Sequence, residues 1–181
     1  MKINIGGGLK KFEGYINVDH DVLTKPDILM DLEKDKFPLE DNSVDEVKAH
    51  HILEHIGDGF FHLMKELYRI CKSGAIIDIC CPHHRHENFY GDPTHRRFIT
   101  VEMLKQFSKK WCDWHQEYWG SSSGFAPRLD VDLEIEDFHY TVDHDYEHLG
   151  REGKYDELNA LARRFNNVFF DTFIKLLVIK E

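Results

Sequence analysis

The sequence alternates short apolar runs with amphipathic segments, and this alternation restricts the fold more than any other feature. Runs rich in β-branched residues predict strands, and apolar residues at helical spacing between them predict helices. Strands that alternate with helices along a chain form mostly parallel sheets. The order of the segments alone therefore predicts an α/β fold.

The predicted strands are Lys2–Ile5, Tyr15–Asp19, Asp27–Leu32, Val44–Ala49, Ala75–Cys81, Val131–Val142 and Val168–Ile179. The predicted helices are Phe60–Lys72, a segment that begins after Thr100, and about Tyr155–Phe165. We expect Gly74 to end the first helix and Thr100 to cap the second. Residues 120–127 read as a loop. The two long strands near the C-terminus predict antiparallel pairing at one edge of the sheet.

Length and composition indicate one globular domain. A chain of 181 residues with 41% hydrophobic and 31% charged residues has the usual size and composition of a single domain. The 33 acidic and 23 basic residues give a net charge of −10, which disfavours nucleic-acid and anionic-membrane partners. There is neither a long apolar run nor a signal-peptide pattern, and the four cysteines show no C-x-x-C spacing. These features predict a cytoplasmic protein with no membrane partner.

A glycine run followed by an acid is the first functional pattern. Gly6, Gly7 and Gly8 follow the first predicted strand, and Asp19 ends the second. Glycines allow the backbone to approach a ligand, and a carboxylate at a strand end binds ribose hydroxyls. The dehydrogenase version is excluded, because G-x-G-x-x-G is absent and Asp19 lies only 11 residues after Gly8. A purely structural turn is the alternative interpretation.

Further segments, in the same order, resemble the class I S-adenosylmethionine-dependent methyltransferases, in particular small members of the type 11-like group. The resemblance covers roughly residues 1–105 and rests on Ile3–Gly8, Gly14–Asp19, Asp31-Leu32, Phe37–Asp45, Leu53–Ile56, Glu66–Gly74, Asp92–His95 and Phe98–Thr100. It implies a Rossmann-like, mostly parallel sheet with an antiparallel terminal strand and helices on both faces. It also implies a single domain over 1–181, with a cofactor-binding core at 1–110 and C-terminal strands and acceptor-side elements at 111–181.

The resemblance implies S-adenosylmethionine as the cofactor and S-adenosylhomocysteine as the product. Gly6 and Gly8 would lie against the methionine part of the cofactor, and Asp19 would bind the ribose. Asp31 and Leu32 would lie near the adenine. The cofactor-binding residues implied in this way are Asn4, Gly6, Gly7, Gly8, Asp19, Asp31, Leu32 and His50.

The sequence also departs from the family pattern. The family's acid two residues before the first glycine is Asn4 here, and Lys10 replaces the third loop glycine. The first helix is largely lost between Gly8 and Gly14, which predicts a more open cofactor site. The N-P-P-Y tetrapeptide of amino methyltransferases is replaced by Lys48-Ala49-His50-His51. This replacement disfavours methylation of nucleic-acid bases, in agreement with the acidic charge.

The predicted reaction is methyl transfer to a small-molecule or glycan-like acceptor, at oxygen. Aligning the acceptor with an activated methyl group supplies much of the reduction of the activation barrier. A hydroxyl acceptor also needs a base that removes its proton. Histidine suits that role because its pKa lies near neutrality. His50, at the tip of the fourth strand, would face the sulfonium and the acceptor. The candidate catalytic residues are His50, His83, His95 and, as an orienting partner, Asp92. Segments 83–98 and 112–127 would shape the acceptor pocket.

Two other interpretations compete with this one. His51, Glu54 and His55 match H-x-x-E-H, a pattern of zinc-dependent hydrolases that the neighbouring histidines His83, His84, His86 and His95 could extend. Against it, Gly57 and Gly59 would cut short the helix that such ligands need, so no metal ligand is assigned. The degenerate glycine loop also allows a non-catalytic module that only binds S-adenosylmethionine. Single histidines can equally be ordinary polar residues.

Overall fold

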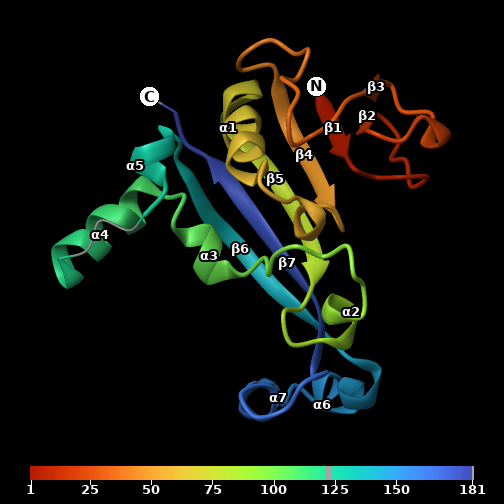
Figure 1. Ribbon diagram of the computed structural model, residues 1–181. Helices are drawn as coiled ribbons and strands as arrows, with labels where there is room; N and C mark the ends of the chain where they lie inside the picture. The colour runs from red at the N-terminus through yellow and green to blue at the C-terminus, as the bar shows by residue number, and fades with distance from the viewer. Residues whose placement is uncertain (121–123, 181) are drawn as a thin grey trace.

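The computed structural model describes residues 1–120 and 124–180. Seven strands form one sheet in the order β3-β2-β1-β4-β5-β7-β6 (Figure 1). Strands β1 to β5 run parallel, and β7 is antiparallel to both β5 and β6. The strands are β1 (Lys2–Ile5), β2 (Ile16–Asp19), β3 (Ile28–Leu29), β4 (Val44–His50), β5 (Cys71–Pro82), β6 (Leu133–Val142) and β7 (Phe169–Val178). This topology confirms the predicted fold class.

In the described part of the chain, all α-helices follow β4, and the longest are α1 and α4 with 11 residues each. The α-helices are α1 (Phe60–Ile70), α2 (Glu87–Tyr90), α3 (Val101–Lys105), α4 (Lys109–Trp119), α5 (Ala126–Leu129), α6 (Glu147–Arg151) and α7 (Tyr155–Ala162). Short 3-10 turns are η1 (Val22–Thr24), η2 (Leu53–His55) and η3 (His144–Tyr146). No helix forms between Gly6 and Tyr15, which confirms the predicted loss of the first helix. None of the described helices has the length and apolar character needed to cross a membrane.

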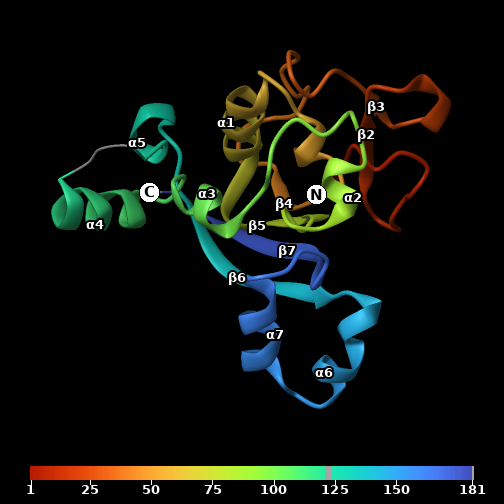
Figure 2. The same ribbon diagram turned by 60° about the horizontal axis from the view of Figure 1, so that its bottom comes forward.

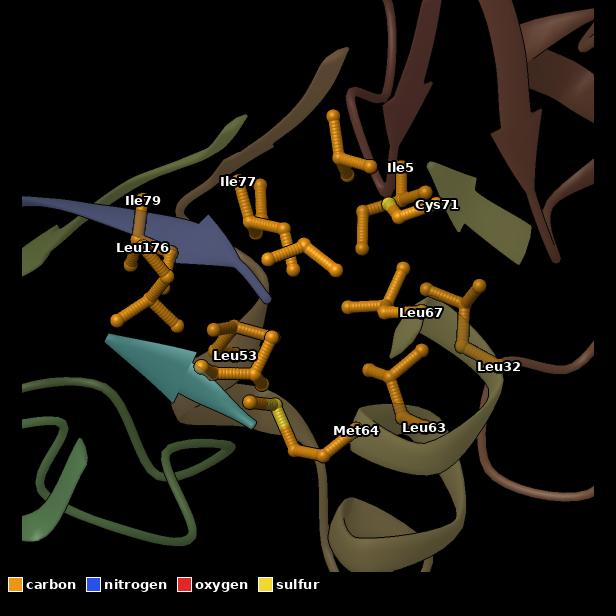
Figure 3. Close-up of a cluster of buried hydrophobic side chains, with 14 of the residues drawn as sticks. Ile5, Leu32, Leu53, Leu63, Met64, Leu67, Cys71, Ile77, Ile79 and Leu176 are labelled. Atoms are coloured by element: carbon orange, nitrogen blue, oxygen red, sulfur yellow. The ribbon is translucent and has the colours of Figure 1, made fainter. Parts of the chain in front are cut away.

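The main core lies between the sheet and α1. Figures 1 and 2 show α1 and α3 on the same face of the sheet. Leu63 and Leu67 of α1 are fully buried in one cluster with Ile77 and Ile79 of β5 and Leu176 of β7 (Figure 3). Burying a side chain of this size contributes about 1.5–3 kcal/mol relative to leaving it in water. The apolar spacing that predicted α1 is therefore the spacing of its buried face.

The boundary between α1 and β5 differs from the prediction. The helix ends at Ile70, and β5 begins at the next residue. Gly74, expected to end the helix, lies inside β5 with a φ of +82°. The pairing of β4 with β5 changes register here, because Val44 lies opposite Cys71 whereas Glu46 lies opposite Ile76. Gly74 therefore takes the positive φ that this bulge requires, and its expected role as a helix end was wrong.

The helix expected after Thr100 is divided into two. Thr100 caps α3 as predicted, since its Oγ1 accepts a hydrogen bond of 3.1 Å from the Met103 amide. A second cap follows at Ser108, whose Oγ accepts from the Trp111 amide at 3.2 Å and starts α4. Helix α5 begins inside the loop expected at 120–127, of which residues 121–123 lie outside the described part of the chain.

Candidate functional site

The glycine loop follows β1 at the carboxyl end of the parallel strands. Gly6 and Gly8 have φ values of +59° and +55°. A Cβ on Gly6 would lie 2.3 Å from Cγ1 of Ile52, and one on Gly7 would lie 2.1 Å from Nδ2 of Asn4. A Cβ on Gly8 would meet nothing within 4 Å. The first two glycines are therefore required by close packing, whereas Gly8 lies at the open side of the loop.

Asp19 connects the end of β2 to this loop. Its Oδ2 accepts a hydrogen bond of 2.9 Å from the Gly8 amide, and its Oδ1 accepts one of 2.9 Å from the Asp21 amide. The residue is 6% exposed. Each carboxylate oxygen has two lone pairs and accepts one of these hydrogen bonds; the nearest further group is Nδ1 of the exposed His20, 3.5 Å from Oδ1. Two neighbouring hydroxyl groups of a ligand would match these two oxygens.

Asn4 supports the loop from within the sheet. Its Nδ2 donates to the Lys10 carbonyl at 3.0 Å and to Oδ1 of Asn17 at 3.1 Å. The side chain is buried, and its Oδ1 has no hydrogen-bond partner. Asn4 therefore fixes the return of the chain after the glycines.

An open cavity of about 670 Å³ lies beside Ile52 and is also lined by His20, Met30, Asp31 and Leu32. Asp31 pairs with Lys34, Nζ to Oδ2, at 2.7 Å, and this hydrogen bond lowers the pKa of the Asp31 carboxyl. Ile52 also touches the glycine loop through Gly6. The structure thus brings the predicted adenine-side residues to the same edge of the sheet as the loop.

His50 ends β4, the neighbour of β1, and its side chain is paired with a carboxylate. Its Nε2 lies 3.1 Å from Oδ2 of Asp78, which also accepts a hydrogen bond of 2.8 Å from Nζ of Lys48. His50, followed by Lys48, lowers the pKa of Asp78 to about 2. Because a carboxylate only accepts, the Nε2 of His50 carries the proton and its Nδ1 remains free. The His50 ring lies edge-on to Phe12 and Phe173.

Comparison with known proteins explains this arrangement. Residues 14–79 match the family model of a methyltransferase domain. Residues 14–79 thus resemble part of a methyltransferase domain. The family match, together with the strand order, confirms the predicted resemblance to the class I S-adenosylmethionine-dependent methyltransferases and the predicted enzyme class. A comparison with curated proteins found no match.

Solved structures of methyltransferases share the fold of this chain. An S-adenosylmethionine-dependent methyltransferase from Archaeoglobus fulgidus is 23% identical, with a TM-score of 0.61 over 97% of this chain and 85% of its own. Phosphoethanolamine N-methyltransferase 2 from Haemonchus contortus, in complex with S-adenosyl-L-methionine, is 15% identical, with a TM-score of 0.57 over 99% and 48%. A methyltransferase from Mesorhizobium loti is 12% identical, with a TM-score of 0.56 over 97% and 89%.

His95 and Asp92 lie in the segment after β5. The Nδ1 of His95 donates to the Phe89 carbonyl at 2.6 Å, which leaves its Nε2 free to accept a proton. That Nε2 lies 3.9 Å from Oδ2 of Asp92, beyond hydrogen-bonding distance. Asp92 instead accepts from the amide and hydroxyl of Thr94, and the Thr94 hydroxyl contacts Nδ1 of His55 at 2.9 Å. The predicted orienting contact between Asp92 and His95 is therefore loose.

His83 is buried against the last two strands. Its ring meets Tyr140 edge-on at 5.2 Å and lies 5.6 Å from the ring of Phe169. Its Nδ1 accepts a hydrogen bond of 3.3 Å from the Arg85 amide. Burial lowers the pKa of His83 to about 4, so the ring is neutral at physiological pH. These contacts give His83 a packing role whether or not it also reaches an acceptor.

The H-x-x-E-H residues do not share one helix face. His51 has a φ of +53°, and the following residues form the 3-10 turn η2 rather than an α-helix. His51 groups with Cys80 and Asp171, whereas His55 groups with His95 and Glu54. Sequence reasoning missed Cys80 and Asp171, because they lie on different strands and only the register of the sheet brings them together.

Proposed function

We propose that this protein transfers a methyl group from S-adenosylmethionine to an oxygen of a small-molecule or glycan-like acceptor. The main support for this proposal is the hydrogen bond between the Gly8 amide and Asp19. This bond connects the glycine loop to the acid at the carboxyl ends of β1 and β2. In open α/β sheets, ligands bind at this end of the strands. The likeness of the fold to a methyltransferase in complex with S-adenosyl-L-methionine supports the choice of cofactor.

The residues present fit this cofactor. Asp19 keeps a free lone pair on each oxygen, so it can accept both ribose hydroxyl groups while it holds Gly8. Gly8 leaves open space where a side chain would project. Asp31 and Leu32 line the adjoining cavity, which suits the adenine. When bound, S-adenosylmethionine supplies the activated methyl group.

His50 is the base that we assign to the acceptor hydroxyl. Asp78 holds the Nε2 proton of His50 and so presents Nδ1 as the nitrogen that accepts a proton. A carboxylate in this position fixes the tautomer of a catalytic imidazole and stabilises its protonated form. The free nitrogen of His95 is also available, but its nearest carboxylate, Asp92, is 3.9 Å away. The orienting hydrogen bond therefore favours His50 over His95.

Two segments near the site would contact the acceptor. They are residues 83–98 and 112–127, and the second belongs to the acceptor-side region 111–181. The net charge of −10 disfavours a nucleic-acid acceptor. The four free cysteines are buried and unpaired, which is consistent with a reducing cytoplasm.

Binding and turnover test the proposal separately. Calorimetric titration of the full chain with S-adenosylhomocysteine should show one bound ligand per chain. A screen of hydroxylated acceptors with methyl-labelled S-adenosylmethionine should then give labelled product. Binding without any transfer across sugars, phenols and hydroxy acids would favour the non-catalytic module, and no binding would remove the proposal.

A further inference from the structure

A compact set of metal-binding side chains lies where β4, β5 and β7 meet. Nε2 of His51 lies 3.4 Å from Sγ of Cys80 and 3.9 Å from Oδ2 of Asp171. All three ligand atoms lie within 4.8 Å of one another. Zinc bonds of about 2.0–2.3 Å at tetrahedral angles separate neighbouring ligand atoms by roughly 3.4–3.6 Å. The three atoms therefore need only small shifts to surround one ion.

The sheet register explains why these side chains converge. Cys80 lies opposite His50 on one side, and opposite Phe173 on the other. Asp171 lies two residues from Phe173, so its side chain projects from the same face of the sheet. The amide of His51 donates to the Cys80 carbonyl at 2.7 Å, which fixes the start of the turn after β4. Cys80 and Asp171 are thus positioned by strands β5 and β7, and His51 is the first residue after β4.

Glu54 provides an independent indication of a cation-binding site. Its side chain is 1% exposed, and both of its carboxylate oxygens lack a hydrogen-bond partner. Oε1 points toward Nδ1 of His51 at 3.5 Å. Asp171 also has a buried, unpartnered oxygen, Oδ1. A buried carboxylate without a hydrogen-bond partner is costly, and the groups near these two carboxylates that can carry a positive charge are histidines: His51, His55 and His95 around Glu54, and His51 and His86 around Asp171.

No lysine or arginine in the described residues 1–120 and 124–180 forms an ion pair with Glu54 or Asp171. A divalent cation would supply the missing positive charge. Histidines that bind metals commonly donate their other ring N–H to a carboxylate, which selects the free nitrogen as ligand. Glu54 has that place relative to His51, since Oε1 faces Nδ1 while Nε2 faces Cys80 and Asp171.

We propose that one zinc ion is bound by Nε2 of His51, Sγ of Cys80 and a carboxylate oxygen of Asp171. The carboxylate of Glu54 faces Nδ1, the other ring nitrogen of His51. A thiolate with an imidazole and a carboxylate favours zinc over magnesium or calcium. The His51 side chain is half-exposed, so a fourth coordination position faces solvent. Water or an acceptor oxygen can occupy it. The site lies on the strand face that also carries His50, one residue before His51.

Zinc and cobalt titrations of the full-length, reduced and chelator-treated chain test this site. Zinc affinity is measured by competition with a chromophoric chelator, and we expect one ion per chain. Cobalt in the same site should show a thiolate-to-metal charge-transfer band. Glu54→Gln should weaken zinc binding about 10–100-fold, and Cys80→Ser should weaken it further because it removes a ligand.

Two variants serve as matched controls. Cys81→Ala removes the neighbouring thiol, which projects into the core toward the Ile99 carbonyl at 3.6 Å. His55→Ala removes a histidine of the other cluster. Both should keep the zinc affinity of the wild type. Circular dichroism of the zinc-free variants checks that each one folds.

Three results would overturn the zinc site: no stoichiometric zinc in the wild type, a cobalt spectrum without the thiolate band, or zinc binding lost in His55→Ala and retained in Cys80→Ser. The cobalt spectrum uses the wild type, so it does not depend on the folding of any variant. The titration with S-adenosylhomocysteine is carried out on zinc-free protein. Failure of the zinc site would therefore leave the test of the methyltransferase function unaffected.

Discussion

At the scale of single residues, Asp19 shows how one side chain supports both the structure and the proposed chemistry. Its carboxylate holds the Gly8 and Asp21 amides and still has lone pairs for two ribose hydroxyl groups. The acid was predicted from its place after the glycine run. Its bonds to the loop were not predicted, because they depend on how the loop folds back over β2.

Asp19→Ala should weaken the binding of S-adenosylhomocysteine at least about tenfold, since each charged hydrogen bond contributes roughly 1.5–3 kcal/mol. Calorimetric titration measures the dissociation constant. Asp137→Ala, at an exposed position of β6, is the control and should bind as the wild type does. An unchanged dissociation constant in folded Asp19→Ala would rule out the ribose assignment.

His50→Ala should lower turnover by about 10²–10⁴ and leave cofactor affinity nearly intact, because it removes the proposed base but no cofactor contact of the loop. Asp78→Asn should lower turnover less, since it removes the group that orients His50. Steady-state kinetics with labelled cofactor measure both effects. Exposed His144→Ala is the control. Full activity in His50→Ala, with loss in His95→Ala, would transfer the role to His95.

His83 should make the protein sensitive to acid. Its pKa is lowered from 6.5 to about 4 by burial, so the unfolded chain binds more protons than the folded chain between these values. The free energy of unfolding should therefore fall as the pH drops through this window, by about 2–3 kcal/mol in all. Denaturant titrations at several pH values compare the wild type with His83→Gln, which keeps an acceptor for the Arg85 amide. Equal pH slopes in both proteins would contradict this role.

At the scale of elements, spacing predicted the strands and helices well and their ends less well. The buried face of α1 can be predicted because its apolar residues repeat at helical spacing in the sequence. The N-cap at Thr100 can be predicted because threonine is a common capping residue. The division into α3 and α4 was missed because Ser108 caps a second helix only once the chain has turned there. Gly74 was misassigned because a bulge and a helix end require the same positive φ.

The glycine loop allows packing and binding to be separated. Gly6→Ala should destabilise the fold, because its Cβ would lie 2.3 Å from Ile52. The side chain in Gly8→Val would meet no such neighbour. The positive φ of this position should lower the free energy of unfolding by about 1–2 kcal/mol. The main effect of Gly8→Val should be weaker cofactor binding. Thermal unfolding and calorimetric titration of both variants measure the two effects. Loss of stability in Gly8→Val without a binding defect would favour a purely structural turn.

At the scale of the whole molecule, the sheet brings together residues that are remote in sequence. The order of the segments predicted an α/β fold with antiparallel pairing at one edge, and the resemblance to the class I methyltransferases implied the rest of the topology. Contacts across strands were not predictable in this way: Asp78 beside His50 depends on the β4–β5 register, and Asp171 beside Cys80 on the β5–β7 register. The H-x-x-E-H pattern, which the sequence already disfavoured as a metal site, does not form a ligand helix because Leu53–His55 fold as the 3-10 turn η2.

In the proposed function, the loop and the acid at the ends of β1 and β2 bind S-adenosylmethionine. Calorimetric titration of the full-length chain with S-adenosylhomocysteine is the decisive measurement. We expect saturable binding of one ligand per chain, weakened at least about tenfold in Asp19→Ala. Absence of binding in the folded wild type, or equal binding in Asp19→Ala, would contradict it.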